Sequence, residues 1–237
     1  MSSNIFTSSV GKKFWMALLG LFLCLFLVVH MAINLLLLFD VENRHYFDTA
    51  VAIMSSPIVK VMEIVLFGGI ALHICLGLFL QIKNWLARPV GYAKKHSSET
   101  SFFSKYMIWT GGIILIFLGI HFVHFFFYKV GWFGFTPESI GISQHIDPNT
   151  GAVTTANHNF YDIARIVYAS KAMCLIYIGF MVLLSFHLLH AFQSAFQSLG
   201  WTHPTYTPII KWVGIIYSVL IPLGFAIIPL YFLFGGQ

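Results

Sequence analysis

The sequence predicts an all-α protein that crosses a membrane five times, and three observations support this prediction. The 237 residues are 58% hydrophobic and only 9% charged, whereas soluble domains carry roughly 25% charged residues. The mean hydropathy is +0.83. Five stretches poor in Asp, Glu, Lys and Arg reach the length of about 20 residues that a helix needs to cross a bilayer. These values argue against a water-soluble enzyme and predict a single transmembrane domain over residues 1–237.

The five helices are expected over residues 14–39, 58–82, 106–128, 168–195 and 210–234. Pro57 suits the first turn of the second helix, and the Gly- and Pro-containing segment 200–208 separates the last two. The first stretch follows Lys12 and Lys13 as a signal peptide would, but it is too long and lacks a small-residue cleavage site, so we expect an uncleaved helix. We expect the long segment 129–165 to cover one end of the helices.

The charged residues predict the orientation of the chain. A cytoplasmic N-terminus and a periplasmic C-terminus put most Lys and Arg residues inside and most acids outside, as the positive-inside rule requires. The basic residues lie between apolar spans and form no basic domain, so we expect no nucleic-acid partner. Cys24, Cys75 and Cys174 are far apart in apolar stretches, form no CxxC, and are expected to be buried as small hydrophobic residues.

Histidines inside the apolar spans are the strongest functional signal, because polar side chains in hydrocarbon are costly and usually serve a function. The predicted spans contain His30, His73, His121, His124, His187 and His190. Counting the helical rise along each span puts His30 and His121 near the outer surface, and His73 and His187 near the inner one. Two neutral imidazoles from different helices can hold the iron of haem b without a CxxCH motif, and none is present.

Two alternatives compete with haem ligation. A histidine in a membrane helix is often a hydrogen-bonded packing residue, and His124 and His190 fit that role. The HxxH pairs also lie one turn apart on a common helix face, so a non-haem metal site is possible. That site lacks a nearby carboxylate, since Glu63 is the one acid expected at membrane depth.

Four stretches of the sequence match the pattern of a known family. The residues concerned are Phe6 to Lys13 with Gly20, Leu21, Phe22 and His30; His73; Thr110, Gly111 and His121; and His187, Ala191, Leu199 and Gly200. Together they cover most of the chain. They resemble the five-helix, dihaem cytochrome b membrane anchor of succinate dehydrogenases and fumarate reductases, particularly the form of Bacteroidetes-like bacteria.

The resemblance implies the haem ligands and the partners. His30 with His121 would hold the distal haem b, and His73 with His187 the proximal one, with His124 and His190 as alternates. The chain would sit in a bacterial cytoplasmic membrane as one subunit of a succinate:quinone oxidoreductase, the respiratory complex II. An FAD-containing flavoprotein subunit would interconvert succinate and fumarate, an iron–sulfur subunit would carry electrons, and this chain would exchange them with a quinone, menaquinone by the same resemblance.

The sequence departs from the family pattern at two positions. Ala191 stands where the motif of the fourth helix usually has Gly, a small-for-small change. Ser185 stands where one branch has a Glu that belongs to a transmembrane proton path. A proton path through that position is therefore not expected. A cytochrome b subunit of a hydrogenase or formate dehydrogenase is the main alternative function.

Further residues are weaker candidates. A quinol site needs a titratable group, and Glu63, ten residues before His73, is the proposed acid or base, although a charge near a helix N-terminus is the simpler explanation. Asn34, His45 and Tyr46 are secondary candidates on the same side. The inner loops 83–105 and 199–211, with Lys94 and Lys95, are expected to dock the partner subunits. Possible haem propionate partners are Lys83, Lys105, Arg44 and Lys129.

Overall fold

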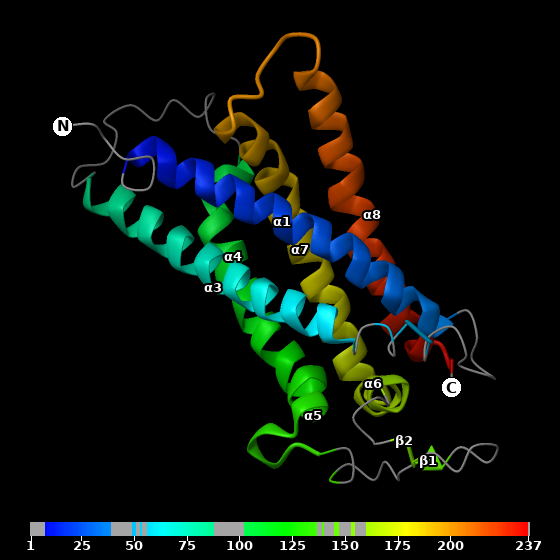
Figure 1. Ribbon diagram of the computed structural model, residues 1–237. Helices are drawn as coiled ribbons and strands as arrows, with labels where there is room; N and C mark the ends of the chain where they lie inside the picture. Colours follow the sequence, from blue (N-terminus) through cyan, green and yellow to red (C-terminus); the bar gives the residue numbers. More distant parts are fainter. Residues whose placement is uncertain are drawn as a thin grey trace. The chain divides into compact units, whose positions relative to one another are not determined.

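The structure, a computed structural model, describes residues 8–38, 49–50, 53, 56–87, 102–136, 139, 145–146, 153–154 and 160–236. Five of its helical segments are long and apolar enough to cross a membrane (Figure 1). They are α1 (Ser9–Leu35) with a final 3-10 turn η1 (Leu36–Leu38), α3 (Pro57–Leu86), α4 (Phe102–His121) with its continuation, α7 (Lys171–Ser198) and α8 (Thr207–Leu233). The predicted all-α fold with five spans is therefore confirmed, and the chain is a multi-pass membrane protein.

Shorter elements follow α4. A π-helix, η2 (Phe122–Phe126), continues it directly and leads into α5 (Phe127–Val130). Gly131 ends α5 with φ 68°, a left-handed conformation that glycine adopts at no steric cost. The 3-10 turn η3 (Trp132–Gly134), the antiparallel strands β1 (His145–Ile146) and β2 (Val153–Thr154), and the helix α6 (Phe160–Tyr168) complete the described elements.

The fourth span, predicted from about residue 168, begins at Lys171 in the structure. A helix from residue 168 was expected, but α6 ends at Tyr168 and α7 begins at Lys171. Ser170 explains the break, because its Oγ accepts a hydrogen bond from the N–H of Met173 at 3.4 Å, as an N-cap residue does. The thiol of Cys174 donates to the carbonyl oxygen of Tyr168 at 3.2 Å. It thereby gives a hydrogen-bond partner to one of the carbonyl groups at the C-terminal end of α6, which have none within the helix.

The first span also begins earlier than predicted, at Ser9 rather than residue 14. Ser8 supplies the reason, since its Oγ accepts a hydrogen bond from the N–H of Gly11 at 3.0 Å. In this first part of the helix, Nζ of Lys12 lies 4.7 Å from the ring centre of Phe79, which is a cation–π contact. A basic helix end is therefore compatible with the apolar span that follows.

The chain forms two compact units. The first contains α1 up to His30, all of α3, α4 up to Gly112, α7 from Leu183, and α8 up to Pro222. The second contains the remaining parts of α1, α4, α7 and α8 together with η2, α5 and α6. The organisation of residues 1–237 as one domain stays a prediction.

Glycines allow close packing of α1 against α3 in the first unit (Figure 1). Met16 lies against Gly77, Gly20 against His73, and Phe22 against Gly69, so the two helices run antiparallel. A Cβ at Gly69 would lie 2.9 Å from Cε1 of Phe22, which is closer than real Cβ contacts come. Small residues of this kind let membrane helices approach each other.

Hydrogen bonds join three helices of the same unit. Ser185 Oγ of α7 donates to the carbonyl oxygen of Ser218 in α8 at 2.6 Å. The hydroxyl of Tyr217 in α8 donates to the carbonyl oxygen of Cys24 in α1 at 2.7 Å. Such bonds between membrane helices are each worth about 0.6 kcal/mol on average. The hydroxyl of Ser185 is therefore used in helix packing.

The core of the second unit gathers around α6. Its buried members are Leu37, Tyr161, Ala164, Tyr168, Cys174, Tyr177 and Ile228. Within α6 the buried residues recur at helical spacing, which gives the helix one apolar face. On its other side Arg165 pairs with Asp162 at 3.9 Å. This helix belongs to the segment that the sequence predicted to cover the ends of the spans.

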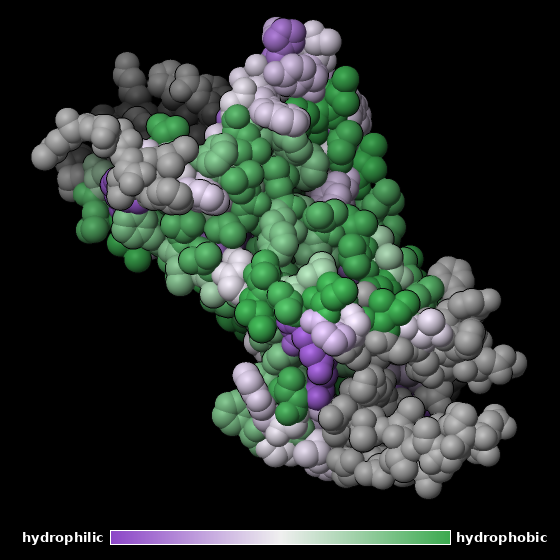
Figure 2. All heavy atoms as spheres, in the orientation of Figure 1, coloured by the Kyte–Doolittle hydropathy of each residue, from purple (hydrophilic) through white to green (hydrophobic). Residues whose placement is uncertain are grey.

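The outer faces of the spans are apolar, as hydrophobic colouring over most of the visible surface in Figure 2 shows. Leu25, Ile64 and Ile116 are 66%, 73% and 62% exposed. Water would not solvate such faces, whereas lipid does. Cys24 and Cys174 are buried as predicted, but the prediction is wrong for Cys75, which is exposed on α3. It shares an exposed face with Leu72, where a weakly polar thiol can contact lipid.

Candidate functional site

The structure brings His73 of α3 and His187 of α7 together in the first unit. Their imidazoles are close enough to interact electrostatically, and both side chains are half-buried. Gly20 of α1 lies beside the first ring, where a Cβ would be 3.8 Å from Cε1 of His73. These are the two histidines that the sequence predicted for the inner haem.

Two linked hydrogen bonds determine which ring nitrogen of His187 carries the hydrogen. Nδ1 of His187 lies 3.4 Å from Oγ1 of Thr110 on α4. The hydroxyl of Thr110 donates its hydrogen to the carbonyl oxygen of Met107 at 2.9 Å. The Thr110 oxygen can therefore only accept from His187, so Nδ1 carries the hydrogen. The lone pair of the ring then lies on Nε2, the form that a histidine ligand of a metal takes.

Gly111 leaves room next to the same ring. A Cβ at this position would lie 3.4 Å from Cε1 and 3.8 Å from Nδ1 of His187. A larger side chain here would press on the imidazole that Thr110 orients. The pair Thr110 and Gly111 on α4 thus positions His187 from one side.

His73 carries an unmet polar atom. Its Nδ1 is buried and has no hydrogen-bond partner in the described part of the chain. A buried polar atom left in this state costs about 1–3 kcal/mol and is rare in native proteins. Each imidazole thus offers one ring nitrogen that no described protein group occupies, Nδ1 of His73 and Nε2 of His187, and a bound group could take both as ligands. A six-coordinate haem b has this ligand set.

The two histidines of the predicted outer pair, His30 and His121, belong to different units. His30 belongs to the first unit, and its ring stacks on Phe26 with centroids 5.1 Å apart. His121 belongs to the second unit, where its ring lies 5.8 Å from Phe117 and 5.1 Å from Phe125 between centroids. The pairing of His30 with His121 stays a prediction.

The second histidines of the HxxH pairs differ from the first. Nδ1 of His124 lies 2.9 Å from the hydroxyl of Tyr177, and the two rings stack. The choice of His121 over His124 as a haem ligand stays a prediction. His190 lies one turn beyond His187 on α7. In the described part of the chain, no three His, Cys, Asp or Glu side chains gather in a group that could hold a metal ion.

The remaining predicted residues are spread over the chain. Glu63 is half-buried on α3, and the antiparallel register of α1 and α3, continued along both helices, puts it level with His30. Asn34 lies on α1. Nζ of Lys83 donates to Oγ of Ser9 at 3.3 Å, and Nζ of Lys129 lies 5.9 Å from the ring centre of Phe126. The first turn of α4 contains Lys105. Arg44, His45, Tyr46, Lys94 and Lys95 lie outside the described residues.

Two functional partners were missed by the sequence reasoning. Thr110 was noted only as part of a family-like segment, and Tyr177 was not noted at all. Both act across the contact between α4 and α7, so sequence spacing carries no signal for them. The helix α6 was also missed, although its apolar residues 160, 163, 164, 167 and 168 follow the helical period and could have revealed it.

The fold and the histidine site define a multi-pass α-helical membrane protein with two imidazoles, those of His73 and His187, within electrostatic range in its first unit. Comparisons with protein-family models, with curated proteins and with solved structures find no match for this chain.

Proposed function

We propose that this chain is a membrane-anchor cytochrome b that carries electrons between an iron–sulfur subunit and a quinone, as in succinate dehydrogenases and fumarate reductases. One observation carries the proposal: His73 and His187 lie in the same unit within electrostatic range, and Thr110 leaves Nε2 of His187 free. The identity of the complex rests on the sequence resemblance.

Each of the two haems would be held by its own pair of histidines. His73 and His187 would bind the inner iron, and His30 and His121 the outer iron. When bound, haem b supplies transfer of single electrons at its iron. Thr110 holds His187 in the ligand tautomer, while Gly20 and Gly111 leave space beside the two inner imidazoles. Apolar helix faces keep water away and so favour the neutral imidazoles that ligation needs.

Two levels of histidines would let electrons cross most of the membrane. The rise of 1.5 Å per residue separates the predicted inner and outer levels by a large part of the roughly 30 Å hydrocarbon layer. The dicarboxylate reaction would occur on the flavoprotein subunit, and this chain would dock that assembly through its inner loops. Its own share of the enzyme would be electron transfer and the quinone reaction, with Glu63 as candidate acid or base.

Purification of the intact complex through a tag on this chain tests the proposal. We expect an FAD-containing flavoprotein and an iron–sulfur protein to co-purify with about two b haems per chain, and succinate to reduce those haems. If hydrogen or formate reduced the haems and a hydrogenase or formate dehydrogenase co-purified, the chain would instead be assigned to that respiratory complex. A well-folded complex without haem would overturn the proposal.

A further inference from the structure

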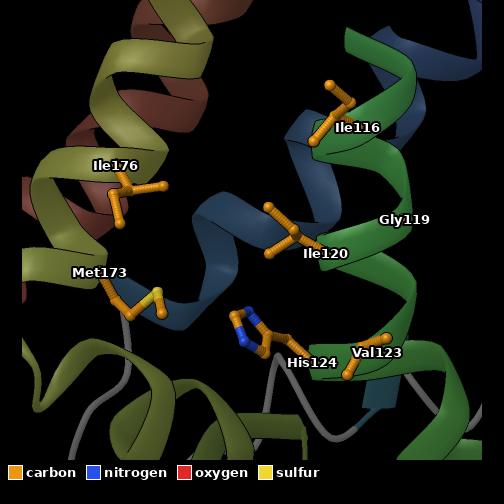
Figure 3. Close-up of a pocket in the computed structure, with 7 residues that line it drawn as sticks. All are labelled: Ile116, Gly119, Ile120, Val123, His124, Met173 and Ile176. Atoms are coloured by element: carbon orange, nitrogen blue, oxygen red, sulfur yellow. The ribbon is translucent and has the colours of Figure 1, made fainter. Parts of the chain in front are cut away.

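A pocket of about 400 Å³ lies between α4 and α7 in the second unit (Figure 3). Its apolar lining is made by Ile116, Ile120, Val123, Met173 and Ile176. Gly119 also lines it and leaves space that a side chain would fill. Ligand pockets commonly measure about 300–1,000 Å³, so the volume suits a small molecule.

His124 is the polar residue of this lining, and Figure 3 shows its imidazole directed into the space between the two helices. The residue lies in the π-helix η2, which continues α4. A π-helical turn changes the direction of the side chains that follow it and occurs frequently at functional sites. The local backbone therefore aims one polar ring into an otherwise apolar pocket.

Tyr177 is the hydrogen-bond partner of that ring. Its hydroxyl lies 2.9 Å from Nδ1 of His124, and its side chain is only 4% exposed. In the described part of the chain, His124 is the hydrogen-bond partner of this hydroxyl, and in one of the two tautomers of the ring the phenolic hydrogen is donated to Nδ1. The hydrogen of the neutral imidazole then lies on Nε2. The pocket thus offers one N–H donor within an apolar lining.

We propose that this pocket binds the ring of a quinone, with Nε2–H of His124 donating to a quinone carbonyl oxygen. The proposal rests on the proposed electron-transfer function, from which the quinone class follows. Ile116 at the pocket is 62% exposed, so the pocket is reached from the lipid-facing surface of α4. A quinone ring reaches the pocket through lipid, fills apolar space and carries the acceptor that the imidazole requires.

A phospholipid acyl chain fits this pocket less well. It would fill the apolar space but offers no acceptor to the imidazole N–H, and a buried donor without an acceptor is unfavourable. Glu63 lies on α3 in the first unit and does not belong to the residues that line the pocket. A quinone contact at His124 would therefore persist when Glu63 is replaced.

Photolabelling of the detergent-purified complex with an azido-1,4-naphthoquinone tests the proposal. We expect labelled peptides from residues 116–124 and 173–177, and loss of the label when excess 2-methyl-1,4-naphthoquinone competes. Labelling that excess quinone does not displace, or that maps to other helices only, would overturn the proposal.

A matched pair of glycine variants sharpens the test. A Cβ at Gly119 or at Gly68 meets no atom within 4 Å, so each helix should tolerate a larger residue. Gly119→Leu should fill the pocket and reduce displaceable labelling at least tenfold. Gly68→Leu on α3 should leave it unchanged. Equal labelling in both variants would contradict the proposal, as would co-purified phospholipid that Gly119→Leu removes while naphthoquinone labelling persists.

Two further variants test the hydrogen bond. His124→Phe keeps a ring but removes the N–H, and it should weaken naphthoquinone binding about three- to tenfold, the value of one hydrogen bond. Tyr177→Phe should weaken binding by less, because it frees the imidazole to change tautomer. Unchanged affinity in His124→Phe would contradict the assigned donor. Haem content is measured in every preparation, so absence of haem would overturn the proposed function while displaceable labelling would still support the pocket.

Discussion

Oγ1 of Thr110 lies 3.4 Å from Nδ1 of His187, across the contact between α4 and α7. Because the threonine hydroxyl already donates to the carbonyl oxygen of Met107, this contact determines which ring nitrogen of His187 carries hydrogen. Partners of this kind orient metal-bound histidines and raise their basicity. Thr110 is thus a positioning residue for the proposed inner haem.

Replacement of Thr110 should therefore weaken haem binding without unfolding the protein. Thr110→Val keeps the shape but removes the hydroxyl, and we expect about a tenfold to hundredfold loss of haem affinity. Transfer of haem to a scavenging protein measures the affinity, and a redox titration should show a changed midpoint potential. Thr110→Ser, which retains the hydroxyl, is the control. Identical behaviour of the Val and Ser variants would remove the positioning role.

Neighbouring glycines of α3 should respond differently to the same substitution. Gly69→Ala would place a Cβ 2.9 Å from Phe22 and should lower the free energy of unfolding by about 1–3 kcal/mol. Gly68→Ala meets no atom within 4 Å and should be neutral or stabilising by up to about 1 kcal/mol. Unfolding in detergent measures both. An equally stable Gly69→Ala would mean that α1 and α3 do not pack as described.

The five spans could be predicted because hydropathy and length report directly on the lipid environment. Helix ends were less accurate, since they depend on local capping. Ser170 divides α6 from α7, and Ser8 moves the start of α1, through hydrogen bonds to one or two backbone N–H groups. A hydropathy profile averages over such single contacts. The π-helix at His124 has no sequence pattern that distinguishes it from the α-helix it continues.

Ser185 provides a test of helix packing. Its hydroxyl donates to the carbonyl oxygen of Ser218 at 2.6 Å, so Ser185→Ala should lower the free energy of unfolding by about 0.6 kcal/mol. Haem content and quinol turnover should not change, because the residue is assigned to packing. A strong loss of turnover with normal stability would instead indicate a role in proton transfer.

Glu63 tests the quinol side of the proposed function. Glu63→Gln preserves shape and polarity but removes the acid–base group, so quinol turnover should fall by about 10²- to 10⁴-fold if the carboxylate is the acid or base. Haem content should remain normal, which separates this effect from misfolding. Full turnover in a variant that retains both haems would show that Glu63 is not the acid or base of the quinol reaction. Its position would then be explained by the favourable placement of a negative charge near a helix N-terminus.

The candidate site was predicted in part because histidines in apolar spans are rare and their levels follow from the helical rise. His73 and His187 were matched by level, and the structure places both in the first unit within electrostatic range, while their role as haem ligands stays a prediction. The roles of Thr110 and Tyr177 were beyond that reasoning, since they depend on how α4 faces α7. Level along a helix can be counted from sequence, but the direction of a side chain around the helix depends on packing.

Haem quantification in histidine variants tests the central claim most directly. The measurement is a pyridine haemochrome assay with reduced-minus-oxidised spectra on the purified complex, for His73→Ala, His187→Ala and the matched control His190→Ala. The account predicts about two b haems per chain in the native protein and the control, and loss of the same single haem in each of the other two variants. Full haem content in His73→Ala and His187→Ala, with the fold preserved, would contradict it.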